Sequence, residues 1–405
     1  MKRRAFLGGV AATSAAVASF PRPALSQGKR QFRLASTYNA TARGYSTSLR
    51  RLVERIRLAS EGQIEIKVFW AGELVDAFDS FDAASRGDID MYYGSEQYWY
   101  KRKSPGYAFF GSLPYGMTVT EHEAWMEYMG GNELWRELSG RFNIMPLAAG
   151  DTGVQMGGWF KREVNSMADF QGLRYRVPGI YGPVIDAVGG KSVSLPGGKI
   201  TAAFEAGELD GAEFVGPWAD REKEFHKFAD YYYWPGVHSP MAMQAIGVNM
   251  EVWENLKPEH QKVMELACQQ ERRDMTEDFY SYHGLVLQQL LREDGVQLRQ
   301  FPDEVLTGIG KAAGEVIADE VQGDELLSRI YASFMNARRR LLRWGGYGDE
   351  SYLVGRRLPF RYGPPGEVSL VKPKPVDPRF LPAGETEQMP APDAEPVITN
   401  TITRI

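Results

Sequence analysis

The spacing of hydrophobic residues near the start of the chain predicts a strand, a helix and a second strand. Phe32 and Leu34 alternate with polar neighbours, and residues 49–56 place apolar side chains at helical spacing with charged residues between them. Gly62 ends that helix, and residues 64–68 alternate again as a half-buried strand. Because two strands joined by a helix run parallel, this segment predicts a βαβ unit in a parallel sheet.

The same order of elements returns in the second half of the chain. Residues 173–177 alternate as a strand, residues 182–188 follow as a helix, and residues 193–195 alternate again. A short helix over 202–206 then precedes a strand over 212–215. The repetition predicts an α/β fold of two lobes built on similar lines.

A much longer helix is predicted from Pro258 onwards. Proline suits the first turn of a helix, no further proline interrupts the chain before Pro302, and an apolar face persists until Gly295. Some 35 residues at 1.5 Å each extend roughly 50 Å, so we expect a helix that braces both lobes. A further amphipathic helix is expected over 325–344, and the proline-rich residues 359–405 are expected to form an extended or disordered tail.

The first 26 residues differ from the rest of the chain. They begin with the cationic Lys2, Arg3 and Arg4, contain no carboxylate, and continue as a small apolar run to Ala18. That run is too short to span a bilayer and predicts an export signal. The arginine pair favours the twin-arginine type, with an ordinary secretory signal as the alternative. On either interpretation the chain leaves the cytoplasm.

Composition excludes several classes of protein. The 20 Phe, 20 Tyr and 9 Trp are too many large side chains for a disordered chain. With 47 basic and 52 acidic residues, the chain lacks the excess of positive charge that is typical of proteins that bind nucleic acid. The single cysteine, Cys268, rules out an internal disulfide or a zinc knuckle, and its helical context favours a buried thiol.

Enzyme signatures are missing or incomplete. The segment 189–192, Gly-Gly-Lys-Ser, resembles the end of a phosphate-binding loop, but Ile185 stands where that loop needs glycine. The sequence has neither a Gly-x-Ser-x-Gly elbow nor a His-Glu-x-x-His motif, and its five histidines are scattered without metal-ligand spacing. Each histidine is therefore interpreted as a surface or core residue, while a catalytic pair among the 52 acidic residues stays open.

Three segments combine polar side chains with glycines or rigid aromatic neighbours, namely 153–160, 172–179 and 208–218. Gln155 offers an amide oxygen among glycines. Arg174 and Arg176 share one face of a strand, near the carboxyl end at which open α/β sheets bind ligands. Glu213 stands in an apolar run, where a carboxylate needs a cation or a donor. Together they favour an anionic ligand held by arginine and a hard cation held by oxygens. The plainer alternative makes Gln155 a surface amide and the arginines solvated charges.

At these residues the sequence resembles the extracytoplasmic solute receptors of tripartite ATP-independent periplasmic (TRAP) transporters. The resemblance runs from about residue 31 to 356 and is most specific in the arginine segment. It is carried by Trp70–Val75, Leu113–Met117, Gly157–Phe160, Phe170–Gly179 and Gly207–Glu213. The resemblance implies an α/β, two-lobed periplasmic solute-binding fold with a long bracing helix. It also implies a receptor that passes a small carboxylate to a membrane permease and performs no chemistry on it.

Within the family, the sequence is most similar to the branch that binds 2-oxo and 2-hydroxy monocarboxylates together with a metal ion. This similarity implies that Arg176 holds the ligand carboxylate, and that Gln155, Glu213 and the Phe214 carbonyl coordinate the cation. The branch commonly has Trp where Phe214 stands, which leaves the carbonyl ligand in place but changes the pocket. Oxygen ligands imply Na⁺ or Ca²⁺ rather than a transition metal.

Aromatic side chains are the expected walls of the pocket, although core packing explains each of them equally well. They are Tyr98, Trp99, Phe109, Tyr115, Trp159 and Trp218, of which Tyr98, Trp99 and Trp159 are expected to touch the ligand. Two other functions stay open, a secreted enzyme acting on a carboxylate in the same cleft and a structural envelope protein. A homodimer through the helix that ends near Trp344 is expected, and a helix folded back on its own lobe is the alternative.

The expected domains follow from the resemblance and the element order. Residues 1–26 form the export signal, and residues 27–152 plus about 243–283 form the first lobe. Residues 153–242 plus about 284–345 form the second lobe, and residues 346–405 form the tail.

Overall fold

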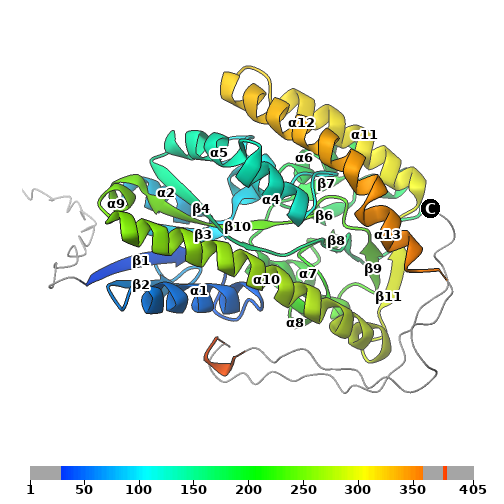
Figure 1. Cartoon of the computed structure of the whole chain (residues 1–405). Coiled ribbons are helices and arrows are strands. Elements are labelled where there is room, and N and C mark those ends of the chain that lie inside the picture. The colour runs from blue at the N-terminus through cyan, green and yellow to red at the C-terminus, as the bar shows by residue number, and fades with distance from the viewer. Residues whose placement is uncertain (1–28, 359–376, 381–405) are drawn as a thin grey trace, which may run out of the picture.

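Two β-sheets lie side by side with helices packed around them (Figure 1). The computed structural model describes residues 29–358 and 377–380. The expected export signal and most of the expected tail lie outside these described residues. Within the described part of the chain, no helix combines the length and apolar composition needed to cross a membrane.

The first sheet has five strands in the order β2-β1-β3-β10-β4. Its strands are β1 (Arg30–Ser36), β2 (Ile64–Phe69), β3 (Met91–Ser95), β4 (Ile144–Asp151) and β10 (Met243–Asn249). The predicted βαβ unit is confirmed, because β1 and β2 pair in parallel and α1 (Tyr45–Ala59) connects them. The sheet as a whole is mixed, because β10 runs antiparallel to both β3 and β4.

The second sheet has six strands in the order β11-β9-β5-β8-β6-β7. Its strands are β5 (Gly158–Phe160), β6 (Arg174–Arg176), β7 (Lys191–Val193), β8 (Gly211–Ala212), β9 (Tyr231–Trp234) and β11 (Gln297–Gln300). Here β6 pairs in parallel with β7 and β8, whereas β5 runs antiparallel to its neighbours. Strand β8 ends before the predicted 212–215 strand does, so Glu213 follows the strand directly.

The helices cover both sheets, and their bounds are as follows. The α-helices besides α1 are α2 (Ser80–Arg86), α3 (Tyr107–Gly111), α4 (Val119–Tyr128), α5 (Gly131–Gly140), α6 (Tyr181–Ala187), α7 (Ile200–Glu205), α8 (Pro217–Glu222), α9 (Met250–Glu254), α10 (Pro258–Arg292), α11 (Asp303–Glu320), α12 (Glu325–Tyr347) and α13 (Asp349–Gly355). The 3-10 helices are η1 (Ala77–Asp79), η2 (Glu96–Trp99), η3 (Met167–Phe170), η4 (Gly197–Lys199), η5 (Phe225–Lys227) and η6 (Pro378–Phe380).

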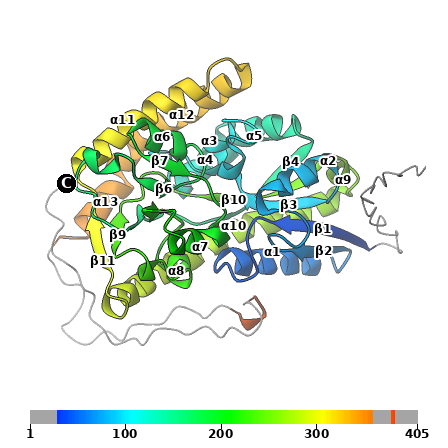
Figure 2. The same cartoon turned by 180° about the vertical axis from the view of Figure 1, so that it is seen from behind.

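The long helix expected after Pro258 is α10, which spans 35 residues. It contacts α1 and β4 beside the first sheet and α8 beside the second, so it braces both halves of the molecule (Figure 2). Cys268 lies on its buried face, as expected, and burial raises the pKa of the thiol.

The last helices differ from the expected domain pattern. Helix α11 packs on α6, but α12 contacts α3, α4 and α5, which lie among the helices beside the first sheet. We expected all of 284–345 in the second lobe. Residues 349–355, expected in the tail, form α13. The exact division of the chain into lobes stays a prediction.

Two connections between the sheets run side by side, and they position the site. Residues 152–157 lead from β4 to β5, and residues 235–242 lead from β9 back to β10. Asp151 ties the two together, because its Oδ1 accepts the N–H of Gly153 at 3.1 Å and that of Ala242 at 3.2 Å. Burial raises the pKa of Asp151 to about 6.

Candidate functional site

Arg176 is the last residue of β6 and is buried, with 1% of its surface exposed. Its Nε and Nη2 both donate to the carbonyl of Leu195, at 3.0 and 2.8 Å, and its Nη1 donates to the carbonyl of Glu213 at 2.7 Å. These bonds fix the guanidinium plane before any ligand arrives. Arg174, two residues earlier, is half-exposed and pairs with Asp210 at 2.6 Å. The two arginines therefore have different surroundings.

Glu213 stands directly after β8, and its own N–H donates to the carbonyl of Arg176 at 3.1 Å. Its carboxylate is 1% exposed, and Oε1 accepts from Nη1 of Arg176 at 2.7 Å. The other oxygen, Oε2, lies 3.1 Å from Nε2 of His238. The sequence argument that a carboxylate in this apolar run needs a cationic partner is consistent with this ion pair.

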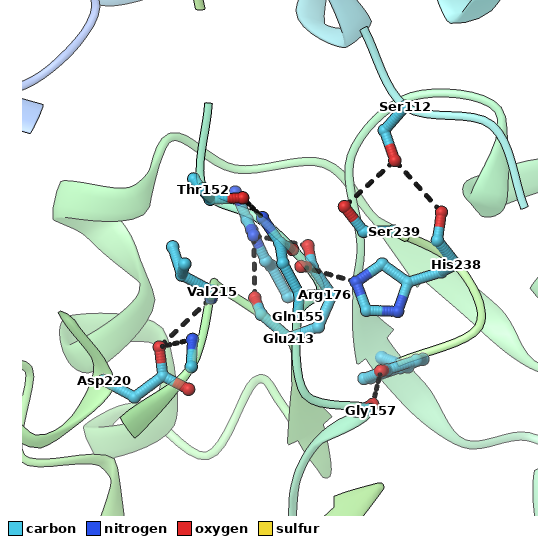
Figure 3. Close-up of polar contacts among 12 residues, drawn as sticks. Ser112, Thr152, Gln155, Gly157, Arg176, Glu213, Val215, Asp220, His238 and Ser239 are labelled. Atoms are coloured by element: carbon cyan, nitrogen blue, oxygen red, sulfur yellow. Dashed lines mark hydrogen bonds and ion pairs between the residues drawn. The ribbon is translucent and has the colours of Figure 1, made fainter. Parts of the chain in front are cut away.

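Gln155 lies on the connection between β4 and β5, against the Glu213 segment. Met156 donates its N–H to the carbonyl of Val215 at 2.9 Å, and Gln155 donates its own to Ser239 at 3.1 Å. The Gln155 amide Nε2 donates to Oγ1 of Thr152 at 2.9 Å, which fixes the amide plane. Its Oε1 is buried and accepts no hydrogen bond. Figure 3 shows Thr152, Gln155, Arg176 and Glu213 gathered in one polar cluster.

The main chain that follows Phe214 is held by Asp220. Its Oδ1 accepts the N–H groups of Val215 and Gly216 at 3.1 and 3.0 Å (Figure 3). Its Oδ2 accepts from the Trp159 indole at 3.0 Å and the Tyr232 hydroxyl at 2.8 Å. Burial raises the pKa of Asp220 to about 7, against the opposing effect of these donors. The loop that carries the Phe214 carbonyl is thus rigidly attached to the second sheet.

Of the three aromatic residues expected to touch the ligand, Tyr98 lies beside Arg176. Burial raises the pKa of Tyr98, and the nearby charge of Arg176 opposes the rise. Trp99 and Trp159 are fully buried in the core instead. Trp99 packs against Phe81, and the indole of Trp159 is stacked on Tyr232 and bonded to Asp220. Both indoles thus make core contacts, and their contact with a ligand stays a prediction.

The other expected wall residues also make structural contacts. Phe109 packs on Phe334, Tyr115 donates its hydroxyl to the Leu306 carbonyl, and Trp218 stacks on Tyr282 of α10.

A cavity of about 260 Å³ adjoins the cluster at the carboxyl end of β6. Its lining comes from both halves of the molecule, with Phe78 and Tyr98 on one side and Val177 and Ser192 on the other. The lining includes Val177, which follows Arg176 in the chain, and Tyr98, which lies beside Arg176, but it includes none of Gln155, Arg176 and Glu213. This position agrees with the rule that ligands of open α/β sheets bind outside the carboxyl ends of the strands.

The polar cluster fits a hard cation. Among the described residues, no group of three or more His, Cys, Asp or Glu side chains is placed to hold a metal ion. The unpartnered Oε1 of Gln155 and the buried carboxylate of Glu213 are oxygen donors of the kind that Na⁺ and Ca²⁺ prefer. An amide oxygen left unpaired in a buried position is costly unless a cation or donor satisfies it.

Two residues of the cluster were not found from the sequence. Thr152 orients Gln155 from three positions upstream, a spacing that carries no signal without the fold. His238 was interpreted as a structural residue, and only the return of the chain between β9 and β10 brings it to Glu213.

Comparison with known proteins identifies the family of the chain. Residues 36–323 match the family model described as bacterial extracellular solute-binding protein, family 7 (DctP). A monocarboxylate 2-oxoacid-binding periplasmic protein from Nostoc sp. is 31% identical over 301 residues, which cover 74% of this chain and 82% of that protein.

Solved structures of TRAP transporter solute-binding proteins are similar over nearly their whole length. One from Bordetella bronchiseptica, a dimer with copurified calcium and picolinate in one active site, has a TM-score of 0.79 and 29% identity, covering 81% of this chain and 97% of that one. One from Pseudoalteromonas atlantica with bound sodium and pyruvate has a TM-score of 0.77 and 30% identity, covering 80% and 99%. The family model matches well over half of the chain, so this protein belongs to the bacterial extracellular solute-binding proteins of family 7, the solute receptors of TRAP transporters, which bind their cargo and are not enzymes.

Proposed function

We propose that this protein captures a small 2-oxo or 2-hydroxy monocarboxylate in the periplasm, together with Na⁺ or Ca²⁺, and delivers it to a membrane permease. The observation that carries the proposal is the unpartnered, buried Oε1 of Gln155 beside the buried Arg176–Glu213 pair. The ligands of the similar proteins support it, since pyruvate is a 2-oxo acid and picolinate carries a second donor atom next to its carboxylate.

Arg176 is the proposed anchor of the ligand carboxylate. Its bonds to Leu195 and Glu213 occupy four of the five guanidinium N–H groups, which leaves one on Nη2 for the acid. Arg176 is also held in place from two sides, so little side-chain freedom is lost when the acid binds. Tyr98 is the proposed aromatic contact, because it lines the cavity beside the guanidinium.

Gln155, Glu213 and the Phe214 carbonyl are the proposed cation ligands. A carboxylate beside the ligand carboxylate repels it, by about 4 kcal/mol for charges 4 Å apart at an effective dielectric near 20. When bound, the cation supplies the positive charge that offsets this repulsion. An acid with an oxygen on carbon 2 offers two oxygens to the same ion, so the site selects such acids.

The direct test combines metal analysis of gently purified protein with calorimetric titration of pyruvate. We expect pyruvate to bind in the presence of Na⁺ or Ca²⁺ and to lose binding after chelation and dialysis into Na⁺-free buffer. Propionate, which lacks the second oxygen, is expected to bind at least about tenfold more weakly. Glu213→Gln should abolish cation-dependent binding, whereas Glu208→Gln, an exposed residue of the same segment, should leave it intact. Normal pyruvate binding by Glu213→Gln would contradict the proposed cation site.

We also propose that the protein is a homodimer. The end of α12, helix α13 and the turn after it expose a set of large apolar side chains, namely Trp344, Tyr347, Tyr352, Val354 and Leu358. Apolar surface of this kind is typical of an interaction site, and the Bordetella structure is a dimer.

A further inference from the structure

His238 lies next to Glu213 although nothing in its sequence context marks it. The imidazole is 5% exposed, and its Nε2 is 3.1 Å from Oε2 of Glu213. An ionised carboxylate can only accept hydrogen bonds, so Nε2 carries the hydrogen and donates it to Glu213.

The position of His238 is fixed from two directions. The carbonyl of His238 and the hydroxyl of Ser239 lie 3.1 and 3.0 Å from Oγ of Ser112, a residue of the segment that ends α3 (Figure 3). The ring of Tyr181 lies over the imidazole, with ring centroids 5.2 Å apart. The donor that faces Glu213 is therefore held by both halves of the molecule.

This donor determines how Glu213 meets Arg176. An arginine and a carboxylate prefer two parallel hydrogen bonds, in which both carboxylate oxygens are used by the guanidinium. Here the pair makes a single side-chain contact, because Oε1 accepts from Nη1 while Oε2 accepts from His238. The divided carboxylate keeps a free lone pair on each oxygen.

We infer that His238 is a positioning residue that prevents Glu213 from closing a two-point ion pair with Arg176. In this way it keeps a Glu213 oxygen available to the cation and an Nη2 hydrogen of Arg176 available to the acid. The inference rests on the proposed function, to whose buried side chains (Gln155, Arg176 and Glu213) it adds a fourth. Without the imidazole, the carboxylate can rotate until both of its oxygens accept from the guanidinium. The Glu213 oxygen and the Nη2 hydrogen of Arg176 are then no longer available to the cation and the acid.

The test compares three variants by calorimetric titration with pyruvate at a fixed Ca²⁺ concentration, and then with Ca²⁺ at a fixed pyruvate concentration. His238→Leu removes the donor and should weaken both affinities by about tenfold or more. His238→Gln restores an N–H donor at similar reach and should stay within about threefold of wild type. The matched control is His260→Leu, because His260 is also 5% exposed and its Nε2 lies 3.2 Å from a neutral acceptor, Oε1 of Gln63. It should bind as wild type does.

A crystal structure of ligand-free His238→Leu tests the inference without any ligand. We expect both oxygens of Glu213 on the guanidinium of Arg176. A carboxylate that keeps its one-point contact would overturn the inference, as would a His238→Gln variant that binds as poorly as His238→Leu. If His238→Leu does not fold, His238→Asn, whose amide is too short to reach Glu213, takes its place in both measurements. Failure of wild type to bind pyruvate with either cation would count against the proposed function alone, and the crystal structure would still decide the role of His238.

Discussion

Arg174 and Arg176 lie two positions apart on one strand, yet only Arg176 is buried and paired with Glu213 in the polar cluster, and it is the proposed anchor of the acid. Arg176→Lys keeps the charge beside Glu213 but loses the planar fork that reaches Leu195 and the ligand together. We expect it to fold and to bind pyruvate at least about tenfold more weakly, a loss near 1.4 kcal/mol. Arg174→Lys should bind as wild type does, since its partner Asp210 is a half-buried residue outside the cluster. Calorimetric titration of both variants with pyruvate measures the two affinities. If Arg174→Lys binds more weakly than Arg176→Lys, Arg174 rather than Arg176 is the anchor.

A buried carboxylate near the site makes stability depend on pH. Burial raises the pKa of Glu96 to about 7, although the Tyr92 hydroxyl and the Trp135 indole donate to its oxygens at 2.8 and 2.9 Å. Between about pH 4.5 and 7 the unfolded chain ionises Glu96 while the folded protein keeps it protonated. The free energy of unfolding therefore falls as the pH rises through this range.

Glu96→Gln removes the charge and keeps both contacts, because the Tyr92 hydroxyl can accept from the new amide. At pH 8 we expect the free energy of unfolding to rise by up to about 3 kcal/mol, and at pH 4 we expect no difference from wild type. Urea unfolding at the two pH values measures this. The exposed Glu133→Gln is the control, and an equal gain at both pH values would show that the effect is not ionisation.

Several residues of the candidate site could be predicted from the sequence, but others could not. Gln155, Arg176 and Glu213 could be singled out because each stands at the end of a strand or on a glycine-rich connection, and they lie in one cluster, while their roles in binding stay a proposal. Trp99 and Trp159 show the limit of this reasoning, since an aromatic residue beside a motif packs equally well into the core. His238 could not be found, because its neighbour in space is 25 positions away along the chain.

At the scale of secondary structure, local patterns were reliable and pairing was not. The helices α1, α6, α10 and α12 lie where the 3.6-residue spacing predicts them. The sheets are mixed because β10 and β5 enter antiparallel, and both are reached by connections between the sheets that leave no periodic signal. A buried strand such as β10, all of whose residues are buried, cannot be told from other apolar segments by alternation.

Arginines of α1 bind three carboxylates of α10, of which Glu271 is the most buried and the one that both Arg51 and Arg55 share, while Asp278 and Asp274 each bind one of them. Glu271 is fully buried and accepts from Arg51 at 2.6 Å and Arg55 at 2.7 Å. Glu271→Gln leaves both arginines without their central partner, so we expect the free energy of unfolding to fall by about 3 kcal/mol. Denaturant unfolding measures the loss, with Glu277→Gln on the exposed face of the same helix as the control that should not change. Equal effects in the two variants would show that this pair is not what holds α10.

For the whole molecule, the apolar ends of α12 and α13 predict self-association. Trp344→Glu places a charge in the centre of the proposed contact, where Trp344 is 69% exposed. Light scattering should give about twice the monomer mass for wild type and the monomer mass for this variant, with pyruvate binding retained. Tyr128→Glu, at an exposed position on α4, is the control and should remain dimeric. A wild-type protein that is monomeric at high concentration would rule out the dimer.

The place of β10 in the first sheet also determines when that sheet can be completed during synthesis. In the described sheet, β4 joins β3 only through β10, and the ribosome synthesises β5 to β9 between β4 and β10. A nascent chain that ends before residue 243 therefore holds its first sheet in two separate pieces. Strands β2, β1 and β3 pair with one another before β10 exists, whereas β4 gains its partner in the sheet only when β10 is present. We therefore expect the first sheet to be completed only after most of the second sheet has been synthesised.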